Sequence, residues 1–339
     1  MLTIDGSYGE GGGQIIRTSL ALSLVTGKAF RVERVRANRQ RPGLQRQHLT
    51  AVLSAAKIGN ASVEGARVGA TEFSFIPGEV TPGEYSFSIG TAGSASLVMQ
   101  ALLPPLMIAD APSVLAIEGG THNLHAPPFE FLQKAFLPLV NRTGPRVSLE
   151  LERYGFYPPG GGRINVLIEP TGERRRLDLL LRGEILRRRA RALVVRLPPH
   201  IAERELAVLG DELGWNEDEL ELETSSNAVS PGNIVTVEIS SEHLTEVFTG
   251  MGERGVRAEV VASRAASEAQ EYLSLDVPVG VHLADQLLIP LALGGGGRYV
   301  TGPLSLHTRT NIEIVRKFLD VKITTAQLSE HVWRIEVEN

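Results

Sequence analysis

His307 has the surroundings that most strongly suggest chemistry in this chain. It is followed directly by Thr308, Arg309, Thr310 and Asn311. Hydroxyl, amide and guanidinium groups bind phosphate oxygens well, so this run of residues is a candidate phosphate site. Most histidines do no chemistry, and a loop histidine without a role is the alternative as long as His307 is considered alone.

A second candidate anion site lies near the N-terminus. Residues 2–16 predict a short strand, a glycine-rich turn and the start of a helix. The glycines let the backbone approach a ligand closely, and the helix N-terminus directs N–H groups at an anion. Glu10 beside such a site suggests a metal bridge, while Gln14 and Arg17 lie one helical turn apart. A plain tight turn is the alternative, because GEGGGQ has neither the P-loop ending nor the glycine spacing of dinucleotide-binding proteins.

An arginine-rich loop follows a predicted strand at residues 29–35. Arg36, Arg39, Arg41 and Arg46 crowd the stretch RANRQRPGLQRQH without a nearby acid. Such a run is either a solvated surface or an anion-binding loop, and the residues alone leave both interpretations open.

Composition limits the class of protein. With 339 residues, 42% hydrophobic and 22% charged, the chain is long enough for a substantial core. The longest apolar region, Ala95–Ile117, is interrupted by Gln100, two prolines and Asp110, so it is not expected to span a membrane. The chain has no cysteine, which excludes disulfides, a thiolate nucleophile and cysteine-bound metal. We therefore expect a cytoplasmic protein. The net charge of −5 argues against a protein that coats nucleic acid without specificity. The basic residues are mostly arginine, 29 against 5 lysines.

The element pattern predicts three similar units. Each has a small-residue turn, a helix, a strand, a polar loop, a second helix and two strands. In the third unit we expect a helix at Ala284–Leu293, a strand at Arg298–Thr301, a loop with His307, and a helix at Ile312–Leu319. Because one unit cannot bury its apolar face alone, we expect the three to pack together and to gather their polar loops on comparable edges.

An insert separates the second and third units. Its arginine-rich beginning gives way to an acidic stretch at 203–223, a shift typical of a separate domain. We therefore expect a large domain from 1–176 and 276–339, and a small α/β domain from 177–275. The arginines at 182–191 are assigned to a solvated helix face, with RNA binding as the alternative. Within the insert, strands are expected at 192–197 and 234–239 and helices at 201–213 and 244–251.

Five long motifs give the chain a resemblance to the RNA 3′-terminal phosphate cyclase family. They occur in family order and span nearly the whole sequence: GEGGGQIIR (9–17), RANRQRPGLQRQHLTA (36–51), GTAGSASLVMQ (90–100), EGGTHNLHAPP (118–128) and ADQLLIPLALGGGG…HTRTN (284–311). The resemblance implies an α/β fold, with a large domain of three βα repeats and a small thioredoxin-like α/β domain inserted before the third repeat.

The resemblance also implies an activity. Members of the family are ligases that use ATP and a divalent metal, Mg or Mn, to convert an RNA 3′-phosphate end to a 2′,3′-cyclic phosphate in RNA processing. A histidine matching His307 takes up AMP covalently and passes it to the RNA as RNA(3′)pp(5′)A. The adjacent 2′-hydroxyl then displaces AMP. The implied partners are RNA 3′-phosphate ends and ATP, with no membrane, and a homodimer is a possible assembly.

The family's site residues transfer to matching positions of this chain. Glu10 would hold the metal. Arg17, Arg39 and Arg41 would hold polyphosphate or the RNA end, and the remaining ATP-site positions are Gln100, Pro127, His282, Leu283, Ala284, Asp285 and Gln286. Position 282 departs from the family, which usually has a tyrosine stacked on adenine there. A histidine stacks less broadly and can be protonated, which affects the expected nucleotide affinity and selectivity.

Three alternatives compete with a cyclase. The ribosome-biogenesis branch of the same fold lacks the nucleophilic histidine, so His307 argues against it. A passive RNA-end-binding protein would form no covalent adduct with AMP. The enolpyruvyl transferases share only a broadly similar repeat architecture. We further expect that the insert, as an independent domain, does not build the nucleotide site.

Overall fold

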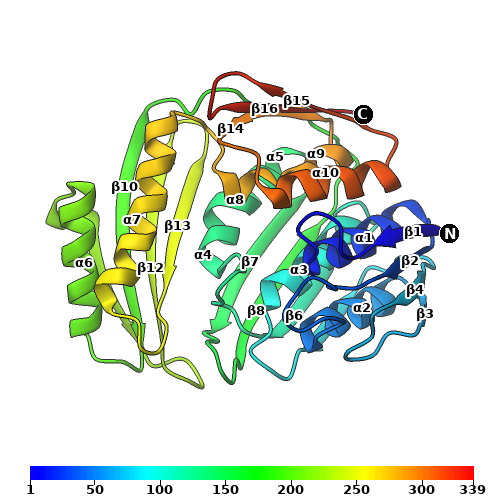
Figure 1. Ribbon diagram of the computed structural model, residues 1–339, viewed down its shortest axis with the longest axis horizontal. Helices are drawn as coiled ribbons and strands as arrows, with labels where there is room; N and C mark the ends of the chain where they lie inside the picture. Colours follow the sequence, from blue (N-terminus) through cyan, green and yellow to red (C-terminus); the bar gives the residue numbers. More distant parts are fainter.

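The computed structural model describes residues 1–339 and has a mixed α/β fold, as the sequence predicts (Figure 1). The strands form four separate sheets of four strands each. Three sheets belong to the repeats, and the fourth lies at the opposite end of the molecule with its own two helices (Figure 1). None of the helices has both the length and the apolar composition needed to span a bilayer.

The first repeat contains the glycine-rich turn and the arginine-rich loop. Its elements are β1 (Leu2–Asp5), α1 (Gly13–Thr26), β2 (Phe30–Glu33), α2 (Arg46–Ile58), β3 (Ser62–Glu64) and β4 (Phe73–Ile76). Gly27 ends α1 in the left-handed conformation at a φ of 69°, a backbone state that glycine adopts without a Cβ clash.

The second and third repeats have the same plan. The second consists of β5 (Glu84–Ser88), α3 (Ala95–Met107), β6 (Ser113–Gly119), the broken helix α4 (Phe129–Phe131), η1 (Leu132–Phe136) and α5 (Leu137–Arg142), then β7 (Arg146–Arg153) and β8 (Gly162–Glu169). The third consists of β9 (Leu177–Leu179), α8 (Val281–Ala284), α9 (Leu288–Leu293), β14 (Gly297–Thr301), α10 (Leu306–Phe318), β15 (Lys322–Gln327) and β16 (Trp333–Glu338).

The three repeats have the same strand order. The three sheets run β1-β2-β4-β3, β5-β6-β8-β7 and β9-β14-β16-β15. In each, the first two strands are parallel and the other neighbours are antiparallel. The predicted three-unit pattern is therefore confirmed. Each unit also begins with a short strand, which the sequence pattern had indicated only for the first.

The insert is a four-stranded sheet with two helices. Its elements are β10 (Ile185–Val195), α6 (His200–Leu213), η2 (Glu217–Glu219), β11 (Leu220–Ser225), β12 (Gly232–Ser241), β13 (Thr245–Met251) and α7 (Ala258–Leu275). The sheet order is β11-β10-β12-β13, with β10 and β11 parallel. A separate cluster of 17 buried hydrophobic residues fills the space between this sheet and its helices.

Two interpretations of the insert were wrong. The arginines at 187–191 lie on strand β10 and not on a helix, because their backbone pairs residue by residue with β12. Residues 245–251 form β13 and not a helix, because they are rich in the β-branched and aromatic types that favour strands and they pair with β12.

The start of the insert also differs from the expected position. β9 pairs in parallel with β14, so residues 177–179 belong to the third repeat's sheet. The insertion therefore interrupts the third repeat after its first strand and does not precede that repeat. The division into a large and a small domain stays a prediction, with its boundary moved past Leu179.

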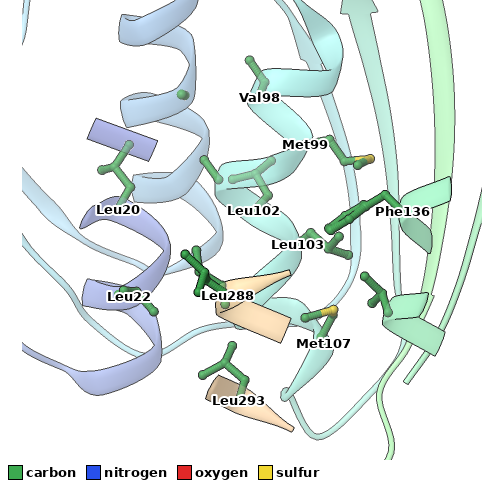
Figure 2. Packing of buried hydrophobic residues seen from close by; sticks show 14 of the residues in the cluster. Leu20, Leu22, Val98, Met99, Leu102, Leu103, Met107, Phe136, Leu288 and Leu293 are labelled. Carbon is green, nitrogen blue, oxygen red and sulfur yellow. The ribbon is translucent and has the colours of Figure 1, made fainter. Parts of the chain in front are cut away.

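The main core lies where the helices of the three repeats meet. A cluster of 62 buried hydrophobic residues draws on every repeat. Leu288 of α9 lies between Leu22 of α1 and Leu103 of α3, and Met99 and Leu103 face Phe136 on the other side of α3 (Figure 2). The repeats therefore share one interior, and side chains at the ends of their helices are held in fixed positions relative to one another.

Candidate active site

A large cavity lies between the repeats and the insert. Its volume is about 540 Å³, and it is lined by α1, α3, the loop at 123–128, the segment 282–290, the start of α10, and elements of the insert. Gln14, Gln100, Asp285 and His307 all face it. The predicted polar loop of the second repeat and the segment around His307 therefore meet at this cavity, whereas the arginine-rich loop of the first repeat is not part of its lining.

The glycine-rich turn lets α1 begin close to its neighbours. A Cβ on Gly13 would lie 2.6 Å from His48 Nε2 and 2.7 Å from Arg17 Nη1, so only glycine fits there. His48 is buried beneath the turn and accepts a hydrogen bond from the Gln45 N–H through Nδ1. Burial and the charges of Arg17 and Arg36 lower the pKa of His48 to about 3, so it stays neutral beside the arginine.

His307 lies in the first turn of α10, which begins at Leu306 and not at Ile312 as expected. The reason is an N-cap that the pattern had not indicated: the Ser305 hydroxyl accepts a hydrogen bond from the Thr308 N–H at 3.1 Å. The same helix is tied to the glycine-rich turn, because the Glu10 N–H donates to the Thr310 hydroxyl at 2.9 Å. The turn and the histidine are therefore held as one unit.

A hydrogen-bonded chain orients the His307 ring. Gln14 Nε2 donates to Asp285 Oδ2 at 2.6 Å, and His307 Nδ1 lies 3.2 Å from Gln14 Oε1. A carboxylate accepts only, so it fixes the amide with its NH₂ group toward Asp285 and its oxygen toward the imidazole. His307 Nδ1 therefore carries the proton, and Nε2 carries the free lone pair. Asn311 supports the chain by donating from Nδ2 to the Asp285 carbonyl at 2.8 Å.

The pKa values at this chain favour a neutral imidazole. Burial, followed by the charges of Arg17 and Arg39, lowers the pKa of His307 below its usual value. Burial raises the pKa of Asp285 to about 7, although His282 and Arg17 oppose the shift. Burial also lowers the pKa of Arg17 to about 10, which still leaves the guanidinium charged at neutral pH.

The predicted metal and phosphate residues lie together at the turn. Arg39 forms an ion pair with the Glu10 carboxylate and donates from Nη2 to the Glu10 carbonyl at 3.0 Å. Arg17 lines the cavity. Arg41 is exposed, and its backbone carbonyl accepts a hydrogen bond from Arg36 Nη1 at 2.7 Å. Glu10, Arg17 and Arg39 therefore lie at the glycine-rich turn, but of the four predicted residues only Arg17 lines the cavity.

Five of the predicted nucleotide residues line the cavity: Gln100, Pro127, His282, Asp285 and Gln286. Gln100 Nε2 donates to Gln286 Oε1 at 2.6 Å, and Gln286 Nε2 donates to the His282 carbonyl at 2.9 Å. Pro127 lines the cavity from the loop at 123–128. The His282 ring is 3.6 Å from the Glu268 carboxylate, and this interaction raises the pKa of His282 despite partial burial.

Leu283 and Ala284 do not face the cavity. Both are buried in the main core, and the Ala284 carbonyl accepts a hydrogen bond from Tyr299 Oη at 2.5 Å. The helix expected at Ala284–Leu293 is split into α8 and α9. Pro290 has no N–H to donate, so it fits the first turn of α9 but would break a continuous helix from Ala284. The intervening turn places Asp285 and Gln286 at the cavity.

The expectation that the insert does not build this site was wrong. Val247, Thr249 and Met251 of β13, with Arg264 and Glu268 of α7, line the same cavity. Misassigning β13 as a helix concealed this, because only a strand places alternate side chains at 247, 249 and 251 on one face.

A further insert residue contacts the segment that leads into α8. Glu246, on the other face of β13, is buried and accepts a hydrogen bond from the Gly280 N–H at 2.6 Å, directly before α8. Gln14 is noted in the sequence for its one-turn spacing from Arg17, but its role in orienting His307 follows only from the contacts of its amide group.

Residues 8–325 match the family model of the RNA 3′-terminal phosphate cyclases. The chain belongs to the RNA 3′-terminal phosphate cyclase family. It is 51% identical to the RNA 3′-terminal phosphate cyclase of Koribacter versatilis, over 96% of this chain and 92% of the relative. It is 48% identical to that of Ectopseudomonas mendocina, over 99% and 98%, and 44% identical to that of Salmonella typhimurium, over 96% and 95%. The resemblance inferred from the motifs is therefore confirmed at the level of the cyclase family.

Proposed function

We propose that this protein is an ATP-dependent RNA 3′-terminal phosphate cyclase that works through a covalent His307–AMP intermediate. The observation that supports it most directly is the His307–Gln14–Asp285 chain, which leaves one ring nitrogen free within a cavity of nucleotide size. Full-length similarity to relatives named RNA 3′-terminal phosphate cyclase supports the substrate class. A cytoplasmic location belongs to the same proposal, because ATP is the substrate.

In the first step, the Nε2 lone pair of His307 attacks the α-phosphorus of ATP. The bond from that phosphorus to the bridging oxygen breaks, and pyrophosphate leaves. The Nδ1 proton stays on the ring, where Gln14 Oε1 accepts its hydrogen bond and stabilises the developing positive charge. Arg17 provides positive charge for the phosphates from the cavity wall.

In the second step, an oxygen of the RNA 3′-phosphate attacks the phosphorus of His307–AMP. The P–N bond breaks, its electrons return to Nε2, and RNA(3′)pp(5′)A forms. The neighbouring 2′-hydroxyl then attacks the 3′-phosphorus, loses its proton and expels AMP as the ring closes. This covalent route replaces a poor phosphate leaving group by AMP in two easier steps. The last step is intramolecular and needs no further nucleophile.

Glu10 suits the divalent metal that the family implies. One carboxylate oxygen pairs with Arg39, while Oε2 is buried without a hydrogen-bond partner. No group of three His, Asp or Glu side chains could hold a metal by itself. A single carboxylate that shares the ion with substrate phosphates fits the way proteins bind Mg²⁺. Glu10 would therefore hold a Mg or Mn ion, which would neutralise charge on the phosphates.

The test is covalent labelling with ATP that carries ³²P at the α-phosphate. The wild-type protein should retain acid-labile label after denaturation, and His307→Ala should retain none. His331→Ala, which removes an exposed histidine in the turn between β15 and β16, is the matched control and should label like the wild type. Label that persists in His307→Ala would refute the assignment.

A second arm separates the nucleophile from a proton shuttle. His307→Ala should still cyclise RNA that already has the 3′-pp-5′A end, because ring closure uses the adjacent 2′-hydroxyl. If His307 acted only as a proton shuttle for direct attack of the RNA phosphate on ATP, wild-type protein would carry no label at any stage.

A further inference from the structure

A buried pair of side chains joins the two ends of the loop that forms one wall of the cavity. We call these joined ends the neck of the loop. All six residues at 123–128 line the cavity. His122 precedes this stretch and Glu130 follows it, and His122 Nε2 lies 3.0 Å from Glu130 Oε2. Their side chains are 0% and 3% exposed. The two ends of the loop are therefore joined beneath the wall that they support.

A third residue ties this neck to the insert. Arg191 of β10 donates from Nη2 to Glu130 Oε1 at 2.5 Å and from Nη1 to Glu223 Oε2 at 2.7 Å. The Tyr154 hydroxyl donates to the other oxygen of Glu223 at 3.3 Å. One guanidinium thus connects a carboxylate of the second repeat with one of the insert's sheet. We call His122, Glu130 and Arg191 the neck clasp.

The loop has little else to define its shape. None of the backbone N–H groups at 123–126 donates to a backbone carbonyl, and Pro127 and Pro128 have no N–H to donate. The side chain of Asn123 donates to the Ala92 carbonyl at 2.6 Å. His125 has a φ of 62°, a conformation that is unfavourable for a residue with a Cβ and persists only where its surroundings impose it. The anchored ends therefore determine where the wall lies.

Electrostatic interactions within the neck clasp stabilise the ionised form of Glu130. Burial alone would raise the pKa of Glu130, but the charges and hydrogen bonds of His122 and Arg191 outweigh it and lower this pKa to about 2. Glu130 is therefore ionised throughout the physiological range. Removing the arginine leaves a buried carboxylate with one partner fewer, and the loop end that carries it must rearrange toward water.

We propose that the neck clasp positions the loop at 123–128, so that the insert controls ATP affinity through Arg191. The proposal rests on the proposed function, which assigns ATP to this cavity. His122 and Glu130 act here as positioning residues, as does Arg191, because none of the three lines the cavity. Loss of the clasp lowers the fraction of molecules with a correctly placed wall, and apparent affinity falls by that fraction.

The experiment compares two arginines of one strand. Arg189 and Arg191 are two residues apart on the same face of β10, but Arg189 pairs with Glu221 inside the insert. Arg191→Met should raise the ATP concentration for half-maximal His307 adenylylation about tenfold, corresponding to roughly 1.4 kcal/mol. The rate at saturating ATP should change less than about twofold. Arg189→Met should match the wild type in both.

Equilibrium binding provides a second readout. The affinity for a non-hydrolysable ATP analogue, measured by calorimetry, should fall about tenfold in Arg191→Met alone. Arg191→Lys keeps the charge but loses the forked contact, so its affinity for the analogue should lie between those of the wild type and Arg191→Met. It is also the variant to use if Arg191→Met does not fold. Unchanged affinity in a folded Arg191 variant, or an equal loss in Arg189→Met, would overturn the proposal. Wild-type protein that binds the analogue but forms no adduct would refute the covalent function and leave the clasp comparison intact.

Discussion

Asp285→Asn tests whether the hydrogen-bonded chain sets the reactivity of His307. In the wild type, the Asp285 carboxylate accepts from Gln14, and this fixes the Gln14 oxygen toward His307 Nδ1. An asparagine can both donate and accept, so the Gln14 amide can turn over and present its NH₂ group to the imidazole. The ring would then protonate on Nε2 and lose its nucleophilic lone pair.

The expected loss follows from the strength of the bond removed. Hydrogen bonds to a charged group are about twice as strong as neutral ones, a difference of roughly 1–1.5 kcal/mol. Asp285→Asn should therefore slow adenylylation at about pH 8 roughly tenfold. The wild type should lose rate as pH falls through about 7, where Asp285 becomes protonated, and not at the lowered pKa of His307.

The assay is single-turnover adenylylation followed by rapid quench between about pH 5.5 and 8.5. The wild-type rate should rise through about pH 7, and the Asp285→Asn rate should be low and flat over that range. If the variant keeps the same inflection, the titrating group is another residue, and the reasoning about Asp285 fails.

The same substitution should affect stability in the opposite direction. The pKa of Asp285 is about 7 in the folded protein and about 3.8 in the unfolded chain, so the folded state binds the extra proton between these values. Wild-type stability therefore falls as pH rises from about 4 to 7, by an amount on the order of 4 kcal/mol. Asp285→Asn removes that loss. Urea unfolding should show the variant more stable at about pH 8 and equal to the wild type at about pH 4.

Three further predictions use other residues. Glu10→Ala should weaken adenylylation and recover partly at high metal concentration; unchanged metal dependence would contradict a role in metal binding. Gly13→Ala should lower ATP affinity, because the new Cβ would displace the Arg17 guanidinium, 2.7 Å away. Gly172→Ala, at a position with open space, is its control in the same binding titration. Glu205→Gln should reduce the loss of stability between about pH 4.5 and 7, because burial raises the pKa of Glu205 to about 7. Its adenylylation rate should not change, since Glu205 lies in α6 away from the cavity lining, and a slower rate would show that this helix affects catalysis.

The repeat and the polar positions of the site could be predicted from sequence because their signals are local. Glycine runs, polar loops and alternating strands recur in order, and the three sheets confirm them. His307 and Gln100 were both found through the motifs that contain them, and both face the cavity. These motifs could be interpreted correctly from sequence because the residues of each motif are consecutive in the chain.

What could not be predicted depends on contacts between distant segments. β13 was taken for a helix because its short apolar pattern is ambiguous until the β12 partner is known. Arg191 looked like one more surface arginine, and only the fold places Glu130 beside it. The polar run from His307 to Asn311 is typical of a loop in sequence, and only the Ser305 cap and the burial of Thr308 and Thr310 show that it is helical.

The position of β9 has a consequence for synthesis of the chain. Asp178 and Arg298, which are hydrogen-bonded across the β9–β14 ladder, are 120 residues apart. β9 leaves the ribosome long before its partner exists, whereas the insert has its own core and can fold in the interval. Arg182 and Asp276, joined at 2.7 Å, bring the two ends of the insert together. A folded insert thus shortens the loop that β9 must close, and delayed folding of the insert would leave the edge of β9 exposed to pairing with other chains.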